Sequence, residues 1–329
     1  MTHPHGGQRR AAAAHYGIPE HEWLDVSTGI APWPWPVPPI PDTVWTRLPE
    51  TDDGLLEAAA TYYGQSPDRL TALPGSQFAI RELPRLLAPA RVAVPGIGYT
   101  EHARAWSAAG HELMFYDSIE ALIAAPGRID HAVVIYPNNP TGEAAALDRL
   151  AVVGERLGAG RLIVDAAFAD CLSDPGIEAL PDNAIVLRSV GKFFGLAGIR
   201  LGFAIGVGPE IESLRSAVAP WGVAHPARWI GRRALADGEW QAGQQRRIRQ
   251  AETWLRALLV DAFGGRPVTS AGLFATVWFD AAHEAPDCHA ALAEQGVLTR
   301  LGDNKHWLRL GLPNEAGRDR LAAALSTLR

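Results

Sequence analysis

The sequence is poor in cysteine and has no long apolar run. Its two cysteines, Cys171 and Cys288, are too few for a disulfide framework, so we expect a reducing compartment, the cytoplasm. No uninterrupted apolar stretch of about 18 residues occurs, and Met1–Arg10 has no apolar core, so we expect neither a membrane span nor a secretion signal. The net charge of −6 and the lack of a basic block argue against a nucleic-acid partner.

Lysine is as scarce as cysteine. Of the 30 basic residues only Lys192 and Lys305 are lysines, and the other 28 are arginines. Any chemistry that needs a lysine amine must therefore use one of these two side chains.

The remaining composition is that of a globular protein. Hydrophobic residues make up 47% of the 329 positions and charged residues 20%, and the length predicts two domains or one large one. Short apolar runs with the character of buried strands alternate with helical segments; these runs are Arg91–Val94, Ala132–Ile135, Arg161–Val164 and Ala184–Leu187. This alternation predicts an α/β fold with a mostly parallel sheet covered by helices, which binds ligands at the carboxyl ends of its strands.

We expect two domains. The sheet defines a large domain over 41–236, and a smaller α+β domain combines 1–40 with 237–329. A long helix over Glu239–Val260 leads into the smaller domain, where Phe274–Phe279 and Trp307–Leu310 are expected strands.

The first forty residues differ from the rest. Proline is dense over Ala31–Pro41, which favours extended backbone, and Ile30, Trp33 and Trp35 supply apolar anchors. We therefore interpret this segment as an arm that docks on the protein, although a disordered tail has the same composition.

The strongest motif is the segment Ser189–Gly202, which follows a predicted strand. It places Lys192 among glycines, where the backbone can approach a ligand closely. Ser189 and Arg200 flank the lysine, and an arginine offers a forked donor set that matches phosphate oxygens.

Three further segments lie after strands or open helices. Pro74–Gln77, with Ser76 and Gln77, precedes a predicted helix and offers free backbone N–H groups to an anion. Asn139 stands between prolines after the Ile135 strand, and Asp165 ends another strand, where a buried carboxylate needs a positive partner. Taken singly, each segment also fits an ordinary helix cap or turn.

Together these residues match the needs of pyridoxal phosphate. This cofactor requires an amine that condenses with its aldehyde, an anion cradle, a carboxylate facing the pyridinium nitrogen and a donor to the phenolic oxygen. The joint pattern is much more specific than any one of its parts.

In these motifs the sequence resembles the fold-type I pyridoxal-phosphate enzymes, the aspartate aminotransferase superfamily, over about Leu48–Arg309. The resemblance implies that Lys192 binds the cofactor aldehyde, that Asp165 pairs the ring nitrogen and that Asn139 bonds the phenolic oxygen. It also implies that Tyr99 stacks on the ring. The phosphate would be held by Ser76, Gln77, Ser189 and Arg200.

The resemblance extends to the substrate and to assembly. Arg309 matches the arginine that clamps the substrate α-carboxylate, and Gly29 contributes backbone to the same group. Members of this superfamily form homodimers, so we expect a homodimer.

Within the superfamily, the short chain is similar to the branch of histidinol-phosphate aminotransferases and threonine-phosphate decarboxylases. The opening His5-Gly6-Gly7, the arm Asp25–Ile30 and Phe168, where the aminotransferases usually carry tyrosine, favour the decarboxylases of cobalamin biosynthesis. A small phosphorylated amino acid would then be the substrate, its phosphate meeting His5, Gly6 and Arg300.

Two positions depart from the superfamily pattern. Leu48 stands where a tyrosine usually reaches the neighbouring subunit's cofactor phosphate, and Ala31 stands where an asparagine is common. The first removes a phosphate donor, and the second removes a side-chain contact to the substrate.

Other functions remain open at this stage. An aminotransferase of the histidinol-phosphate type would share every cofactor residue, and a non-catalytic binding module would keep the fold alone. A metal enzyme is disfavoured because His283, Cys288 and His289 do not have a zinc-site spacing, and no glycine fingerprint indicates a nicotinamide cofactor.

Overall fold

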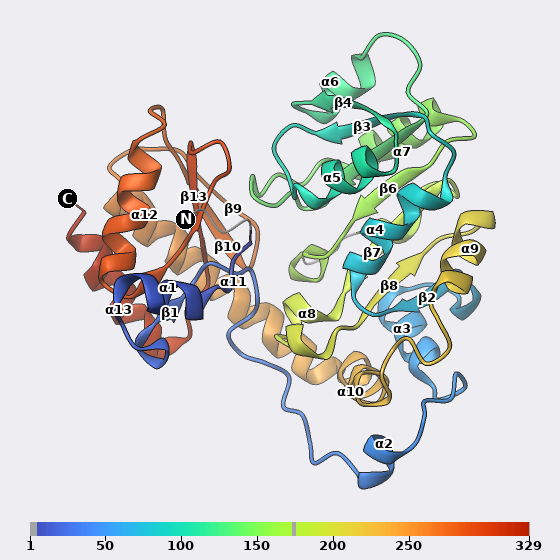
Figure 1. Ribbon diagram of the computed structural model, residues 1–329, viewed down its shortest axis with the longest axis horizontal. Helices are drawn as coiled ribbons and strands as arrows, with labels where there is room; N and C mark the ends of the chain where they lie inside the picture. Colours follow the sequence, from blue (N-terminus) through green and yellow to red (C-terminus); the bar gives the residue numbers. More distant parts are fainter. Residues whose placement is uncertain (1–4, 173–175, 329) are drawn as a thin grey trace. The chain divides into compact units, whose positions relative to one another are not determined.

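The computed structural model describes residues 5–172 and 176–328, which form two compact units (Figure 1). The large unit comprises Pro34–Asn139 and Glu143–Gly243. The small unit comprises the described residues up to Trp33, the short segment Pro140–Gly142 and the described residues from Gln244 onward. The chain therefore crosses between the units on both sides of 140–142, an exchange that the expected division into 1–40, 41–236 and 237–329 does not contain.

The large unit is built on a seven-stranded sheet with the strand order β2-β8-β7-β6-β5-β3-β4. All neighbouring strands run parallel except β8, which is antiparallel to both β2 and β7. The strands are β2 (Leu70–Leu73), β3 (Arg91–Pro95), β4 (Glu112–Tyr116), β5 (His131–Ile135), β6 (Leu162–Asp165), β7 (Ala184–Ser189) and β8 (Gly202–Ile205). The prediction of a mostly parallel sheet is confirmed.

This topology brings the ends of distant segments together. The carboxyl ends of the parallel strands and the amino end of the reversed strand β8 lie at one edge of the sheet, where α/β folds bind their ligands. The ends of β6 and β7, the segments that follow β2, β3, β5 and β7, and the loop that precedes β8 carry the predicted cofactor residues.

Both faces of this sheet are buried. On one face alternate strand residues such as Val94, Val133, Ile163 and Leu187 pack with side chains of α4, α5 and α9, Trp106 among them. Successive strand residues point to opposite faces, and those on the other face, such as Phe203, are also buried. Strands covered on both sides explain the continuous apolar runs in the sequence.

The helices of the large unit begin with α2 and α3, which contact α10. The α-helices are α2 (Asp42–Thr46), α3 (Leu55–Tyr63), α4 (Ser76–Leu86), α5 (Glu101–Ala108), α6 (Ile119–Ala124), α7 (Leu147–Leu157), α8 (Val190–Phe193), α9 (Pro209–Ala217) and α10 (His225–Ala236). Short 3-10 turns are η2 (Pro67–Arg69), η3 (Ala169–Cys171), η4 (Ile177–Ala179) and η5 (Ala197–Ile199). The long helix α11 (Gly238–Ala262) begins in this unit and continues in the other.

The small unit has a four-stranded antiparallel sheet with the order β12-β13-β10-β9 and a two-stranded parallel pair of β1 with β11. Its remaining elements are α1 (Arg9–Tyr16), η1 (Glu20–Glu22), β1 (Leu24–Asp25), β9 (Val268–Ser270), β10 (Phe274–Trp278), α12 (Glu284–Glu294), β11 (Val297–Leu298), β12 (Arg300–Leu301), β13 (Trp307–Gly311) and α13 (Glu315–Ser326).

The first forty residues are only partly an extended arm. Helix α1 and strand β1 are regular elements of the small unit, whereas Ala31–Pro41 forms neither helix nor strand. Trp35 is buried in the large unit, where its backbone N–H donates to the Phe194 carbonyl at 2.9 Å and its indole Nε1 donates to Asp237 Oδ2 at 2.9 Å. The proline-dense stretch is therefore anchored by its tryptophans.

None of the helices over the described residues is long and apolar enough to cross a lipid bilayer.

Candidate active site

Lys192 lies in the short helix α8, directly after strand β7. Its side chain is half-buried, and its Nζ lies 5.4 Å from the centre of the Phe168 ring. Phe168 is buried and follows strand β6. Two neighbouring strand ends therefore place the predicted amine against an aromatic face that carries no hydroxyl.

Asp165 ends strand β6 and is only 5% exposed. Its Oδ2 lies 2.9 Å from Nε2 of His102, which is also buried, and its Oδ1 accepts the Ala167 backbone N–H at 3.1 Å. His102 Nδ1 is buried and has no hydrogen-bond partner among the described residues, so Nε2 is the ring nitrogen that bonds Asp165. The carboxylate is thus kept as an acceptor at the edge of the sheet.

His102 is a residue of the site that the sequence motifs do not single out. A signal was present, because a carboxylate expected to be buried needs a partner, and a histidine stands three residues after Tyr99. The pairing itself joins α5 to β6, which are far apart in the sequence, so only the fold reveals it.

The beginning of helix α4 has the geometry of an anion cradle. The helix starts at Ser76, so Ser76 and Gln77 lie in its first turn, where backbone N–H groups have no acceptor within the helix. Gly75 has φ +81°, and a Cβ there would lie 2.5 Å from Nη2 of Arg200. The guanidinium of Arg200 therefore lies directly beside the helix start, and only glycine allows this approach.

Ser189 reaches the same place through strand pairing. Ser189 pairs with Gly202 in the β7–β8 ladder, and a Cβ at Gly202 would lie 2.5 Å from the Ser76 backbone nitrogen. The structure thus gathers Ser76, Ser189 and Arg200 around one helix N-terminus, which supplies a partial positive charge.

The Gln77 side chain is engaged within the protein. Its side-chain oxygen accepts the Tyr99 hydroxyl at 2.9 Å, and its amide nitrogen donates to Glu101 at 3.4 Å. The side chain is thus engaged with α5 and its preceding loop, so the backbone N–H of Gln77 is the part directed to an anion.

Tyr99 is held in its protonated form. Burial, with the nearby Glu101 carboxylate as the next cause, raises the pKa of Tyr99 to about 12. Its ring stands edge-on to His102, with 6.3 Å between the centres. A neutral tyrosine therefore lies beside the Asp165–His102 pair.

Asn139 follows β5 through the cis peptide bond Tyr136–Pro137 and is half-buried. The neighbouring Asn138 side chain donates to the Ile97 carbonyl at 2.9 Å, which ties this loop to the one that leads to Tyr99. Asn139 is thus on a braced loop at the same edge of the sheet.

The donor set of the large unit fits pyridoxal phosphate. The helix start with Arg200 suits its phosphate, the buried Asp165 carboxylate suits a protonated ring nitrogen, and Lys192 suits its aldehyde. The Gly75 cradle, which a Cβ would fill, leaves backbone and guanidinium groups at the phosphate position.

The small unit contains the second predicted group. Arg309 on β13 is 7% exposed, its Nη2 donates to the Ser27 carbonyl at 2.8 Å, and its guanidinium lies 5.2 Å from the Phe274 ring centre. Arg300 is its register partner on β12. Burial, followed by the charge of Arg300, lowers the pKa of Arg309 to about 10. Arg300 Nη2 also donates to Asp303 Oδ1 at 3.0 Å, and the two guanidinium groups supply donors that suit an anion.

The amino-terminal residues pack against Ser27, whose carbonyl accepts a hydrogen bond from Arg309. Gly6 packs against the Ser27 backbone, and the Gly7 N–H donates to Ser27 Oγ at 2.7 Å. His5 is exposed, whereas Gly29 is buried. The Ser27 carbonyl that accepts from Arg309 thus belongs to the segment on which the Gly6-Gly7 turn docks.

Comparison with known proteins supports the family. The sequence profile described as aminotransferase class I and II matches residues 44–325. The chain is 44% identical to a threonine-phosphate decarboxylase of Pseudomonas aeruginosa, covering 98% of this chain and 96% of the relative. It is 41% identical to a threonine-phosphate decarboxylase of a Sinorhizobium species, covering 98% of each.

The fold also matches a solved structure. Histidinol-phosphate aminotransferase from Sinorhizobium meliloti, in complex with pyridoxal-5'-phosphate, superposes with a TM-score of 0.84 at 21% identity, covering 97% of this chain and 94% of that one. The predicted fold and the predicted superfamily are confirmed.

Proposed function

Because the chain belongs to the aminotransferase class I and II family, we propose that it is a pyridoxal-phosphate-dependent carboxy-lyase. Its substrate would be L-threonine O-3-phosphate and its products (R)-1-amino-2-propanol phosphate and carbon dioxide, for cobalamin biosynthesis. The two full-length relatives at 44% and 41% identity support this choice over transamination.

One observation carries the substrate assignment. Arg300 and Arg309 are paired across β12 and β13, and each is largely buried. Two adjacent guanidinium groups suit a substrate that carries both a carboxylate and a phosphate. L-threonine O-3-phosphate has both groups on a short skeleton.

We assign the roles as follows. Arg309 and the Gly29 backbone hold the substrate carboxylate, and Arg300, His5 and Gly6 meet the substrate phosphate. Ser76, Gln77, Ser189 and Arg200 hold the cofactor phosphate, Tyr99 covers the ring, and Asn139 bonds its phenolic oxygen.

The bound cofactor supplies an electron-withdrawing ring that accepts the electron pair of the breaking bond. Asp165 keeps the ring nitrogen protonated, and His102 holds Asp165 in place. Lys192 would hold the cofactor aldehyde, and its amine would supply the proton that the substrate Cα takes up in place of the departing carbon dioxide.

The test is carbon dioxide release from L-threonine O-3-phosphate by the purified, cofactor-loaded protein with no 2-oxo acid present. Sustained release over many turnovers is the expected result. A single conversion of the cofactor to its amine form by an amino donor, without carbon dioxide, would instead identify an aminotransferase of the histidinol-phosphate type. If neither reaction occurred, the result would favour a non-catalytic binding module.

We also propose that the protein acts as a homodimer through one surface of the large unit. Trp45, Leu48 and Trp221 are each at least 60% exposed, an unusual state for side chains of this size. His225 Nδ1, which follows Trp221 closely, donates to the Arg47 carbonyl at 3.1 Å and ties the two segments together.

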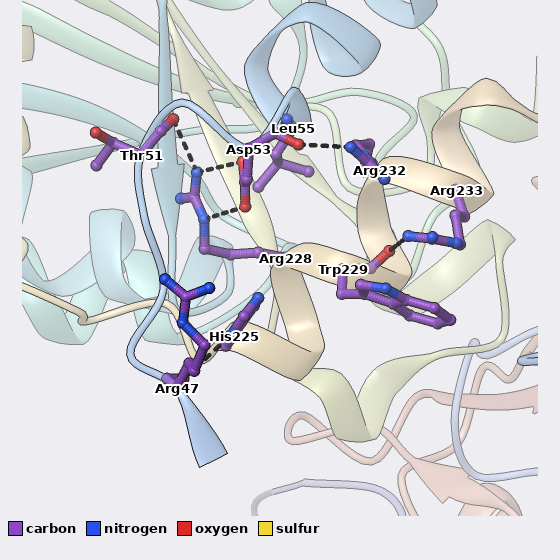
Figure 2. A network of polar contacts seen from close by, with 9 residues as sticks. All are labelled: Arg47, Thr51, Asp53, Leu55, His225, Arg228, Trp229, Arg232 and Arg233. Carbon is purple, nitrogen blue, oxygen red and sulfur yellow. Dashed lines mark hydrogen bonds and ion pairs between the residues drawn. The ribbon is translucent and has the colours of Figure 1, made fainter. Parts of the chain in front are cut away.

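Hydrogen bonds and an ion pair hold Thr51 and Asp53 in the loop that follows Leu48 (Figure 2). Buried Arg228 donates to both oxygens of Asp53 at 2.7 and 2.8 Å and to the Thr51 carbonyl at 3.3 Å. Arg232 donates to the Asp53 carbonyl at 2.9 Å. A preorganised loop with exposed apolar side chains favours association, because little conformational entropy remains to be lost. A second copy of the chain is the partner that we propose.

We propose that the enzyme acts in the cytoplasm. Two cysteines, Cys171 and Cys288, in 329 residues are too few for a disulfide framework, which suits a reducing compartment.

A further inference from the structure

A second buried ion pair lies on the face of the sheet opposite Asp165. Arg188 Nη2 and Asp170 Oδ1 are 2.5 Å apart, and both side chains are almost completely buried. The Tyr62 hydroxyl donates to the same Asp170 oxygen at 3.0 Å, and the Arg188 guanidinium lies 4.6 Å from the Tyr63 ring centre. Asp170, Tyr62 and Tyr63 are the groups that face the Arg188 charge.

This cluster is costly to bury. Asp170 Oδ2, Arg188 Nε and the Tyr63 hydroxyl are buried and have no hydrogen-bond partner among the described residues. A buried ion pair with unmade hydrogen bonds contributes little net stability, and well-packed apolar side chains often do better. Its presence therefore calls for a reason other than stability.

Each member of the cluster is linked to Lys192, either along the chain or through an aromatic ring close to it. Arg188 is on β7, which leads through Ser189 into the helix of Lys192. Asp170 is in the η3 turn that follows Phe168, whose ring contacts the Lys192 amine. The Tyr62 ring lies 5.6 Å from the Phe194 ring, two residues after Lys192.

We propose that Asp170, Arg188 and Tyr62 form a charge-balanced positioning cluster that fixes Lys192 against Phe168 and cancels the Arg188 charge four residues before the lysine. The ion pair clamps the Phe168 turn to β7, and Tyr62 ties both to the segment after Lys192. This inference rests on the proposed function only in taking Lys192 as the reactive amine.

The chain offers a direct test because it has only two lysines. The full-length protein, freed of cofactor, is trace-labelled with acetic anhydride over a range of pH, and mass spectrometry gives the labelling of Lys192 relative to Lys305. Lys305 is the internal reference, since it is far along the chain in the small unit.

The two single variants should move this ratio in opposite directions. Asp170→Asn leaves the Arg188 charge uncompensated, which favours the neutral, reactive amine and raises the ratio near pH 8 by about threefold to tenfold. Arg188→Gln leaves the carboxylate uncompensated and lowers the ratio by a similar factor. The double variant Asp170→Asn/Arg188→Gln should return to within about twofold of the wild type.

A purely structural role predicts a different pattern. Loosened packing would raise the ratio in both single variants, and the double variant would not recover; that pattern overturns the proposal. Tyr116→Phe removes a buried hydroxyl outside the cluster, one that donates to the Val133 carbonyl, and is the matched control, with a ratio near that of the wild type. Asp170→Glu keeps the charge and should do the same.

The measurement stays decisive if the single variants fail to fold. The swapped pair Asp170→Arg/Arg188→Asp then replaces them, and a wild-type ratio supports the charge balance, whereas a changed ratio contradicts it. Because the readout needs no turnover, opposite shifts without any carbon dioxide release would sustain the cluster and reject the proposed reaction.

Discussion

At the residue scale, the arrangement around Asp165 depends on one histidine. A carboxylate at 5% exposure is stable in its charged form only with donors, and the His102 ring and the Ala167 N–H supply them. The His102 ring also packs edge-on against Tyr99, so His102 contacts both Asp165 and Tyr99 at the sheet edge.

We predict that His102→Phe lowers kcat/KM by about tenfold, the usual cost of losing a partner that orients a functional group. The loss follows because Asp165 would keep only its backbone donor. Steady-state carbon dioxide release measures it, together with cofactor binding by fluorescence. His102→Gln retains an N–H donor and should recover part of the rate; unchanged kinetics in the phenylalanine variant would contradict this role.

The second residue-scale prediction concerns the two lysines. Lys192→Ala should reduce carbon dioxide release by about ten-thousandfold or more, because the anchoring amine and the proton donor are the same group. Lys305→Ala is the matched control and should keep the wild-type rate. Borohydride treatment of the loaded wild type should attach a pyridoxyl group to the Lys192 peptide alone, and attachment at Lys305 would refute the assignment.

At the element scale, a histidine–tryptophan stack joins helix α5 to the sheet. Trp106 lies 5.8 Å from His131 in a stacked arrangement and 4.6 Å from His111 edge-on, measured between ring centres. His131 Nδ1 accepts the Arg161 N–H at 2.9 Å, and His111 Nε2 lies 2.7 Å from the Pro84 carbonyl while its Nδ1 accepts the Ala90 N–H. Burial, with His111 as the next cause, lowers the pKa of His131.

This stack predicts loss of stability in acid. Because the folded pKa of His131 is below its ordinary value of 6.5, the folded state binds fewer protons than the unfolded state. Its contribution is complete above pH 6.5 and is lost as the pH falls below that value. The urea midpoint of the wild type should therefore drop between pH 7.5 and pH 5.

The control for this prediction is His131→Asn, which keeps an acceptor for the Arg161 N–H but does not titrate. Its urea midpoint should depend less on pH over the same window. An equal drop in both proteins would assign the acid sensitivity to other groups, such as His289, whose pKa burial also lowers.

At the scale of the whole molecule, the exposed apolar side chains of the large unit mark the surface through which we propose that two chains associate. Trp45→Glu and Leu48→Glu should each shift the particle toward the 35.3 kDa mass of one chain, because charge would be buried in the proposed interface. Sedimentation velocity measures the mass. Phe115→Glu alters a side chain of similar exposure on the edge strand β4 and should leave the dimer intact; a wild-type particle of one chain would reject the proposal outright.

Sequence alone determined the fold class and the superfamily, because buried parallel strands give continuous apolar runs and because the cofactor motifs resemble those of the superfamily in their order along the chain. The strands before Asp165 and Lys192 were predicted for the first of these reasons. Strand β8 was not, since its Gly202–Ile205 run differs little from the glycine-rich loop before it.

Only the tertiary structure decided which side chains meet. The Asp165–His102 and Asp170–Arg188 pairs join elements on opposite faces of one sheet, and the reversal of β8 brings Arg200 beside Gly75. Contacts of this kind depend on strand order and on which face a residue occupies. Local periodicity determines neither strand order nor the contacts across a sheet. The sequence therefore predicts the candidate site residues but not the residues with which they pair.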